Sequence, residues 1–174
     1  MGGAVQIAMH AFGKMTLFMC AGAIYVATKK TNISQMRGLG RVMPFTFGAF
    51  FIGALSIIGL PPLGGTWTKF YLMIGAADAG QIAFIFVLMA SSLLNVAYLL
   101  PPVVRAFYSP RPADEAAGGP DANGDVSGVR WGALKEAPLL CVAPPCFTAV
   151  GAVVLFFFAE PLTQFLAPIL ASGE

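Results

Sequence analysis

Charge is the scarcest property of this sequence. Of its 174 residues, 10% are Asp, Glu, Lys or Arg, whereas 57% are hydrophobic, and the mean hydropathy is +0.79. Soluble domains carry about 25% charged residues, so the composition excludes an ordinary soluble domain and predicts a polytopic membrane protein. The net charge of +2 is small and no basic patch interleaved with aromatic residues is present, so we expect no nucleic-acid partner.

Motifs of enzymatic chemistry are also missing. The sequence has no GxSxG, P-loop, GxGxxG or HExxH motif, and no carboxylate pair falls within its apolar runs. Cys20, Cys141 and Cys146 form no CxxC or Cys/His cluster and are interpreted as small core residues. We therefore expect no metal site, no cofactor and no enzyme. The N-terminus has neither the basic region nor the cleavage site of a signal peptide, and it begins as if within a larger or split protein.

Four apolar runs reach the length of about 20 residues that a bilayer-spanning helix needs. They are residues 4–28, 43–77, 81–107 and 137–158. The second run is too long for one straight helix, and the segment PPLGG at 61–65 interrupts it. Pro61 and Pro62 cannot donate a backbone hydrogen bond, and Gly64 and Gly65 tolerate unusual backbone dihedrals.

Basic residues outside the apolar runs predict the topology. They gather in the loop 29–41 and the region 105–136, and basic loops stay on the cytoplasmic side. An even number of crossings must then separate the two regions. The run 43–77 is therefore a single crossing, broken in its middle, and both chain ends lie on the outer side. The sequence predicts an all-α integral membrane protein with four spans, the second a broken helix.

Three regions follow from this reading. Residues 1–108 form a broken-helix segment with three spans and a path for protons. Residues 109–136, rich in Pro, Gly, Asp and Ala, form a flexible cytoplasmic loop. Residues 137–174 form the last span and a C-terminal tail.

The break at 61–65 lies close to a lysine. Backbone that is not helical at membrane depth survives only where protein buries it or where it lines a wet cavity, and broken helices are typical of ion sites in transporters. An ordinary proline kink or a surface turn between two spans would also explain the break. Lys69, four residues after Gly65, favours a functional break.

His10 and Lys14 are spaced i, i+4 and so share one helix face. A charged lysine in hydrocarbon costs at least about 2.5–3.5 kcal/mol, so Lys14 and Lys69 should face the bundle interior or water. Burial favours the neutral amine, and histidine titrates near neutral pH, so the three side chains can pass protons to internal water. The alternatives are a hydrogen-bonded core histidine and a lysine that reaches the membrane surface, which Lys14 is too deep to do.

Other polar side chains give weaker signals. Thr66 and Thr68 flank the break and could satisfy freed backbone groups or line a wet path. The third span adds polar residues that could line the same path, although helix–helix hydrogen bonds explain them equally well. These are Ser91, Ser92, Asn95 and Tyr98. No carboxylate lies at this depth, so an acidic partner for the lysines must come from another segment or subunit.

Two stretches resemble a known family: HAFGKMTLFMCAGAI, and MRGLGRVMPFTFGAFFIGALSIIGLPPLGGTWTKFYLM after a basic loop. They resemble the C-terminal half of the antiporter-like proton-translocating subunits. This family includes the large membrane subunits of respiratory complex I and the A- and D-type subunits of Mrp-type cation/proton antiporters. The resemblance covers residues 4–108 and continues more weakly through EAPLLCVAPPCFTAVGAVVLFFF. The stretch SSLLNVAYLLPPVVRAF favours the D-type subunits.

The resemblance implies a fold of fourteen spans with two inverted repeats, of which this chain holds the last four. It implies that Lys69 is the terminal channel lysine in the second broken helix and that Lys14 and His10 are relay residues. The N-terminal repeat is absent, so a partner chain would supply those spans, in the inner membrane of a bacterial cell.

Three functions follow as expectations. The first is a partial subunit of a Na⁺ or K⁺/proton antiporter, which works with the other antiporter subunits. The second is a proton-pumping subunit of a complex I-like quinone reductase or a membrane-bound hydrogenase. The third is a non-conducting assembly fragment, for which replacing Lys69 would change only stability.

Overall fold

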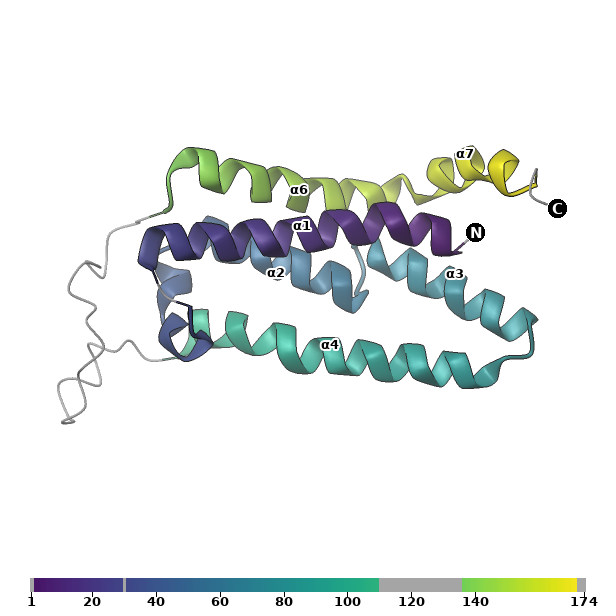
Figure 1. The fold of residues 1–174 in the computed structure, drawn as a ribbon, viewed down its shortest axis with the longest axis horizontal. Coiled ribbons are helices and arrows are strands. Elements are labelled where there is room, and N and C mark those ends of the chain that lie inside the picture. Colours follow the sequence, from purple (N-terminus) through teal and green to yellow (C-terminus); the bar gives the residue numbers. More distant parts are fainter. Residues whose placement is uncertain (1, 30, 110–135, 172–174) are drawn as a thin grey trace.

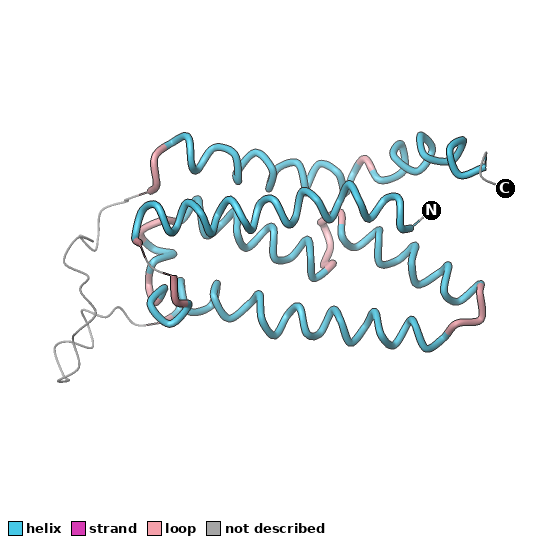
Figure 2. The backbone as a smooth tube through the Cα atoms, viewed as in Figure 1, coloured by secondary structure: helices cyan, strands magenta, loops and turns pink. Residues whose placement is uncertain are grey.

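A computed structural model describes residues 2–29, 31–109 and 136–171, and the regular elements in these ranges are all helices (Figures 1 and 2). The all-α prediction is therefore confirmed. The helices are α1 Gly2–Thr28, α2 Pro44–Ile58, α3 Gly65–Asp78, α4 Ile82–Tyr108, α6 Leu139–Phe157 and α7 Ala159–Ala171, with 3-10 turns η1 Ile33–Met36 and η2 Leu39–Arg41. Most of the predicted flexible loop at 109–136 and the last three residues of the predicted tail lie outside the described residues.

Three of the helices, α1, α4 and α6, are long and apolar enough to cross a membrane. They have 27, 27 and 19 residues and coincide with the predicted runs 4–28, 81–107 and 137–158. The remaining predicted run, 43–77, contains two shorter helices, α2 with 15 residues and α3 with 14. The link 59–64 separates them.

The helices lie along one long axis (Figure 1). Helix α1 packs against α6, α2 and α3, and α4 packs against α2 and α3. Along this axis α3 follows α2, and the two together extend over about the same length as α4, which runs back beside them. The start of α1 and helix α7 lie at one end of the bundle, and η1, η2 and the last turn of α4 lie at the other (Figure 1).

Local chemistry sets where α2 begins and ends. Pro44 occupies its first turn, where the missing N–H is no loss. The Glu136 carboxylate accepts hydrogen bonds from Phe45 N–H at 2.8 Å and Thr46 Oγ1 at 2.7 Å, which caps the helix start. Gly59 ends the helix with φ of +86°, a left-handed conformation that favours glycine.

Buried side chains lie between the helices, and large apolar side chains face outward. A hydrogen bond of 2.8 Å between Thr16 Oγ1 in α1 and Thr148 Oγ1 in α6 joins these two helices in addition to packing. In the most apolar stretch of α4 only 6% of the residues are buried. This outer surface suits lipid or further helices, as expected for a membrane protein.

Candidate functional site

The site is built around the link between α2 and α3. Pro61 and Pro62 are exposed within it, and Gly64 is buried. The first residue of α3, Gly65, lies so close to α2 that an added Cβ would be 1.8 Å from the Ser56 carbonyl oxygen. Only glycine permits this approach, and it holds the start of α3 against the last turn of α2.

Backbone groups left unpaired by the break find partners elsewhere. Gly64 N–H donates to the Ala152 carbonyl in α6 at 3.3 Å. The Ile58 carbonyl, at the end of α2, accepts a hydrogen bond from Lys69 Nζ. The amine of Lys69 thus occupies a helix C-terminus, where the helix dipole favours a cation.

Lys69 is half-buried and is held on two further sides. Its Nζ donates to Ser92 Oγ in α4 at 2.5 Å, and Ser92 Oγ donates to the Leu88 carbonyl at 3.0 Å. A Cβ added at Gly59 would be 2.8 Å from Lys69 Cδ, so the lysine stem lies directly against the link. Three helices therefore fix the position of one amine.

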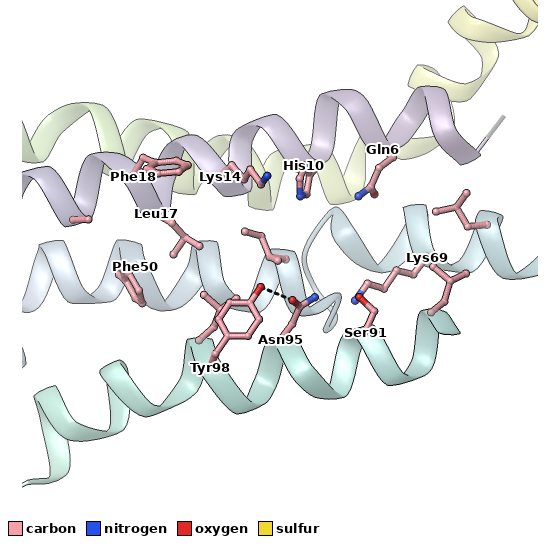
Figure 3. Close-up of a pocket in the computed structure, with 15 residues that line it drawn as sticks. Gln6, His10, Lys14, Leu17, Phe18, Phe50, Lys69, Ser91, Asn95 and Tyr98 are labelled. Atoms are coloured by element: carbon pink, nitrogen blue, oxygen red, sulfur yellow. Dashed lines mark hydrogen bonds between the residues drawn. The ribbon is translucent and has the colours of Figure 1, made fainter. Parts of the chain in front are cut away.

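This amine borders a cavity of about 580 Å³ between α1, α2, α3 and α4. Figure 3 shows Gln6, His10 and Lys14 along one side of α1, facing Lys69 and the polar residues of α4. His10 is half-buried and Lys14 is exposed. The polar lining residues are Gln6, His10, Lys14, Lys69, Ser91, Asn95 and Tyr98. No carboxylate belongs to the described lining.

The structure gathers most of the polar residues singled out from the sequence. His10, Lys14, Lys69 and Asn95 line one cavity, and Ser92 contacts Lys69 directly. Ser91 and Tyr98 line the same cavity, and the Tyr98 hydroxyl donates to Asn95 Oδ1 at 2.5 Å.

The two threonines beside the break differ. Thr68 is buried, and its Oγ1 donates to the Gly65 carbonyl at 2.9 Å, where it pairs a backbone group at the break. Thr66 does not line the large cavity, and its Oγ1 is buried without a partner in the part of the chain that the structure describes. Trp67 packs against Phe70, Tyr71 and Phe156, as a packing residue would.

Sequence reasoning missed two contributors. Gln6 lines the cavity one turn before His10, and the spacing i, i+4, i+8 of Gln6, His10 and Lys14 was a signal that could have found it. Gly59 lies beside the PPLGG segment, but the sequence pattern gives it no role. Its contact with Lys69 depends on a three-dimensional fold-back that no local pattern shows.

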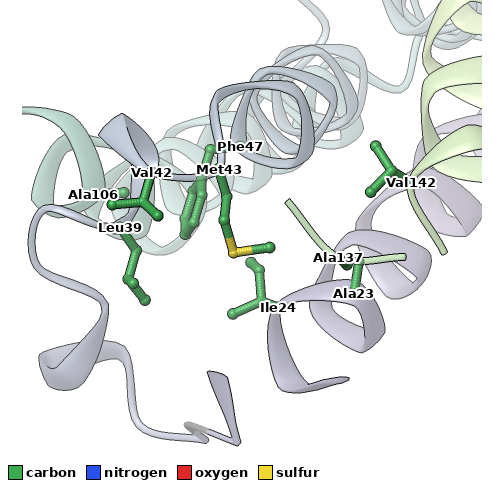
Figure 4. Close-up of a cluster of buried hydrophobic side chains, with 9 residues drawn as sticks. All are labelled: Ala23, Ile24, Leu39, Val42, Met43, Phe47, Ala106, Ala137 and Val142. Atoms are coloured by element: carbon green, nitrogen blue, oxygen red, sulfur yellow. The ribbon is translucent and has the colours of Figure 1, made fainter. Parts of the chain in front are cut away.

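At the end of the bundle opposite the chain termini, apolar side chains fill the space between the helices (Figure 4). This cluster brings Ile24 of α1, Leu39, Met43 and Phe47 together with Ala106 of α4. The large cavity begins beyond this apolar cluster and runs alongside the link 59–64, since Phe50 and Ile57 of α2 and Lys69 and Leu72 of α3 all line it. Among the described residues, no group of three or more His, Cys, Asp or Glu side chains is placed to hold a metal ion.

Comparison with known proteins agrees with the resemblance seen in the sequence. The family described as NADH:quinone oxidoreductase/Mrp antiporter, TM, matches residues 1–95. The chain is 35% identical over 164 residues to NADH-quinone oxidoreductase subunit N of Desulforudis audaxviator, which covers 92% of this chain and 31% of that protein. It is 30% identical over 164 residues to the D-type subunit of the Na⁺/H⁺ antiporter of Alkalihalophilus pseudofirmus, which covers 94% of this chain and 30% of that protein.

A solved structure has the same fold. A chain of respiratory complex I from Thermus thermophilus with bound aureothin matches 90% of this chain and 33% of its own length, with a TM-score of 0.63 and 21% identity. This chain thus spans about a third of the length of these three proteins. Because the family match extends over more than half of its residues, the chain belongs to the NADH:quinone oxidoreductase/Mrp antiporter transmembrane family.

Proposed function

We propose that this chain forms part of a proton-translocating membrane subunit, in which Lys69, His10 and Lys14 pass protons through internal water. One observation carries the proposal. The amine of Lys69 is bound to the Ile58 carbonyl at a break between two helices, and it shares a cavity with His10 and Lys14. An ionisable group at such a place is expensive to keep in a membrane and is by default functional.

The membrane arrangement follows from the helix lengths. At 1.5 Å per residue, α2 and α3 each extend about 21–23 Å, which is less than the hydrocarbon thickness of about 30 Å. Neither crosses the membrane alone. We propose that α2, the link 59–64 and α3 form one broken crossing, which with α1, α4 and α6 gives four spans. The basic regions then lie on the cytoplasmic side of a bacterial inner membrane, and both chain ends lie on the outer side.

The relay needs only proton exchange. A neutral Lys69 amine accepts a proton and becomes an ammonium, which its carbonyl and hydroxyl partners stabilise. The ammonium returns the proton to water in the cavity, and neutral His10 or Lys14 takes it up. Ser91, Ser92, Asn95 and Thr68 supply oxygen atoms that can hold such water.

One side of the large cavity, beside Lys14, is open. Lys14 is exposed on an apolar helix, and the described cavity lining has no acid to pair with it. We propose that a further part of the full assembly, carrying the remaining spans of the family fold, covers this side and brings a carboxylate to it.

Two couplings fit this site. The first, expected from the sequence, is exchange of protons for Na⁺ or K⁺ as part of a D-type antiporter subunit, which agrees with the relative named as such a subunit of a Na⁺/H⁺ antiporter. The second is redox-driven pumping, which agrees with the relative named NADH-quinone oxidoreductase subunit N. The same lysine relay serves both.

Inverted vesicles separate the possibilities. The chain would be expressed with the proteins encoded beside it in a host that lacks its own antiporters, with and without Lys69→Ala. Collapse of the proton gradient on adding Na⁺ or K⁺, lost in the variant although it still inserts, supports the antiporter. Proton pumping that requires a quinone and a reductant supports the second coupling. Proton movement that is the same with and without Lys69 would refute the relay and leave an assembly role.

A further inference from the structure

A second, much smaller cavity lies where α1 meets the end of α2 and the start of α3. It is lined by residues of α1, α2 and α3, and most of them are polar. The lining residues are Gln6, Met9, His10, Ser56, Ile57, Gly65, Thr68 and Lys69. The cavity leaves about 10 Å³ for the centre of a water molecule, which is room for a single water molecule.

We infer that Ser56 and Thr68 hold one ordered water molecule that joins Lys69 to His10. The inference rests on the proposed function and deepens it, because it assigns the shortest step of the relay to a fixed position. Ser56 and Thr68 thereby become positioning residues.

Unused hydrogen-bonding capacity around this cavity supports the inference. A lysine ammonium has three N–H donors, and Lys69 uses two of them on Ile58 and Ser92. Thr68 Oγ1 donates its proton to the Gly65 carbonyl, so its lone pairs can accept a hydrogen bond from the water. Within the described residues, no hydrogen bond joins the His10 ring directly to Lys69, although both line the cavity.

The hydroxyl groups beside the small cavity are deeply buried, which favours an ordered water molecule at one position. Thr68 and Ser56 are 1% and 3% exposed, and buried polar groups of this kind are normally satisfied by protein or by ordered water. The Ser56 hydroxyl lies toward α1, since a Cβ added at Gly13 would be 3.5 Å from its Oγ. A water here would have two to four polar partners, which is what an ordered internal water needs.

The proton balance of the step is simple. The Lys69 ammonium gives a proton to the water, and the water gives one of its own protons to a neutral ring nitrogen of His10. The products are a neutral amine, an unchanged water and an imidazolium. Because the water is held in place, the hydrogen-bonded chain from Lys69 to His10 does not have to form anew for each proton.

The test is proton transport by the full complex in vesicles, with a matched pair of isosteric variants. Thr68→Val and Thr16→Val each remove a fully buried hydroxyl that donates to the carbonyl of the preceding turn, but Thr16 lines neither cavity. Loss of one hydrogen bond to the water should slow transport roughly 2- to 10-fold for Thr68→Val, whereas Thr16→Val should match the parent. Thr68→Ser keeps the hydroxyl and should restore transport.

A double-mutant cycle adds a readout that a structural role would not move. If Ser56 and Thr68 act through the same water, Ser56→Ala combined with Thr68→Val should slow transport by less than the product of the two single effects. A map of the whole complex that resolves ordered water should show a peak within about 2.6–3.2 Å of Thr68 Oγ1 and Lys69 Nζ.

The outcomes separate the inference from the proposal beneath it. If Lys69→Ala abolishes transport but Thr68→Val behaves like Thr16→Val, or the cavity is dry in the map, the water site is wrong and the relay stands. If Lys69→Ala itself leaves transport unchanged, the proposed function fails and the water site fails with it.

Discussion

The close approach at Gly65 makes a quantitative prediction about the break. In Gly65→Ala the new Cβ would start 1.8 Å from the Ser56 carbonyl oxygen, and the two atoms must separate by about 1.2 Å to reach 3.0 Å. Both partners belong to helix backbone, so no side-chain rotation relieves the clash. Overpacking of this kind typically costs about 1–3 kcal/mol, which lowers the folding equilibrium roughly 5- to 150-fold.

The control lies in the same helix. A Cβ added at Gly75 meets nothing within 4 Å, so Gly75→Ala should be neutral or should stabilise α3 by about 0.5–1 kcal/mol. Denaturant titration of the purified complex in detergent measures both variants. Gly65→Ala should also slow proton transport, because a displaced α2 end moves the Ile58 carbonyl that holds Lys69. Equal stability and equal transport in the two alanine variants would refute the packing argument.

Two further predictions concern the ends of α2. Gly59→Ala should lower proton transport more than Gly80→Ala. Both glycines have positive φ, but only a Cβ added at Gly59 meets Lys69, at 2.8 Å. Equal transport in the two variants would contradict this. Glu136→Ala should destabilise the complex by about 0.5–2 kcal/mol, because α2 loses its cap. The stability of Glu136→Gln should lie between that of Glu136→Ala and that of the parent. Proton transport per assembled complex should be unchanged in both variants. Thermal or denaturant unfolding at equal lipid content measures this second effect.

Much of the fold was predictable because hydrocarbon imposes strong rules. The need for about 20 apolar residues per crossing located α1, α4 and α6 within a few residues. The PPLGG segment located the end of α2 and the start of α3, since proline and glycine interrupt helices for local reasons. A C-terminal tail was expected, but its start as a separate helix at Ala159 was not marked by any such signal.

The site was predictable where one helix face carries it. His10 and Lys14 share a face by spacing alone, and Lys69 was conspicuous as a charge in an apolar run. The partners of Lys69 were harder to predict, because Ser92 lies 23 residues away and the Ile58 carbonyl is backbone. Contacts of this kind depend on how α3 turns back toward α2 and α4, which no local pattern encodes.

Chemical rescue of Lys69 tests the central claim most directly. In a complex whose native cysteines, including Cys20, Cys141 and Cys146, have been replaced, Lys69→Cys would be alkylated with 2-bromoethylamine. The thiolate displaces bromide and gives an amine of nearly lysine length. A neutral alkylating reagent of similar size serves as the control.

The proton-relay account predicts that Lys69→Cys loses proton transport, that the aminoethyl group restores it, and that the neutral group does not. Transport that persists in Lys69→Cys, or that returns equally with the neutral group, would contradict the account, because the amine would then not carry the proton.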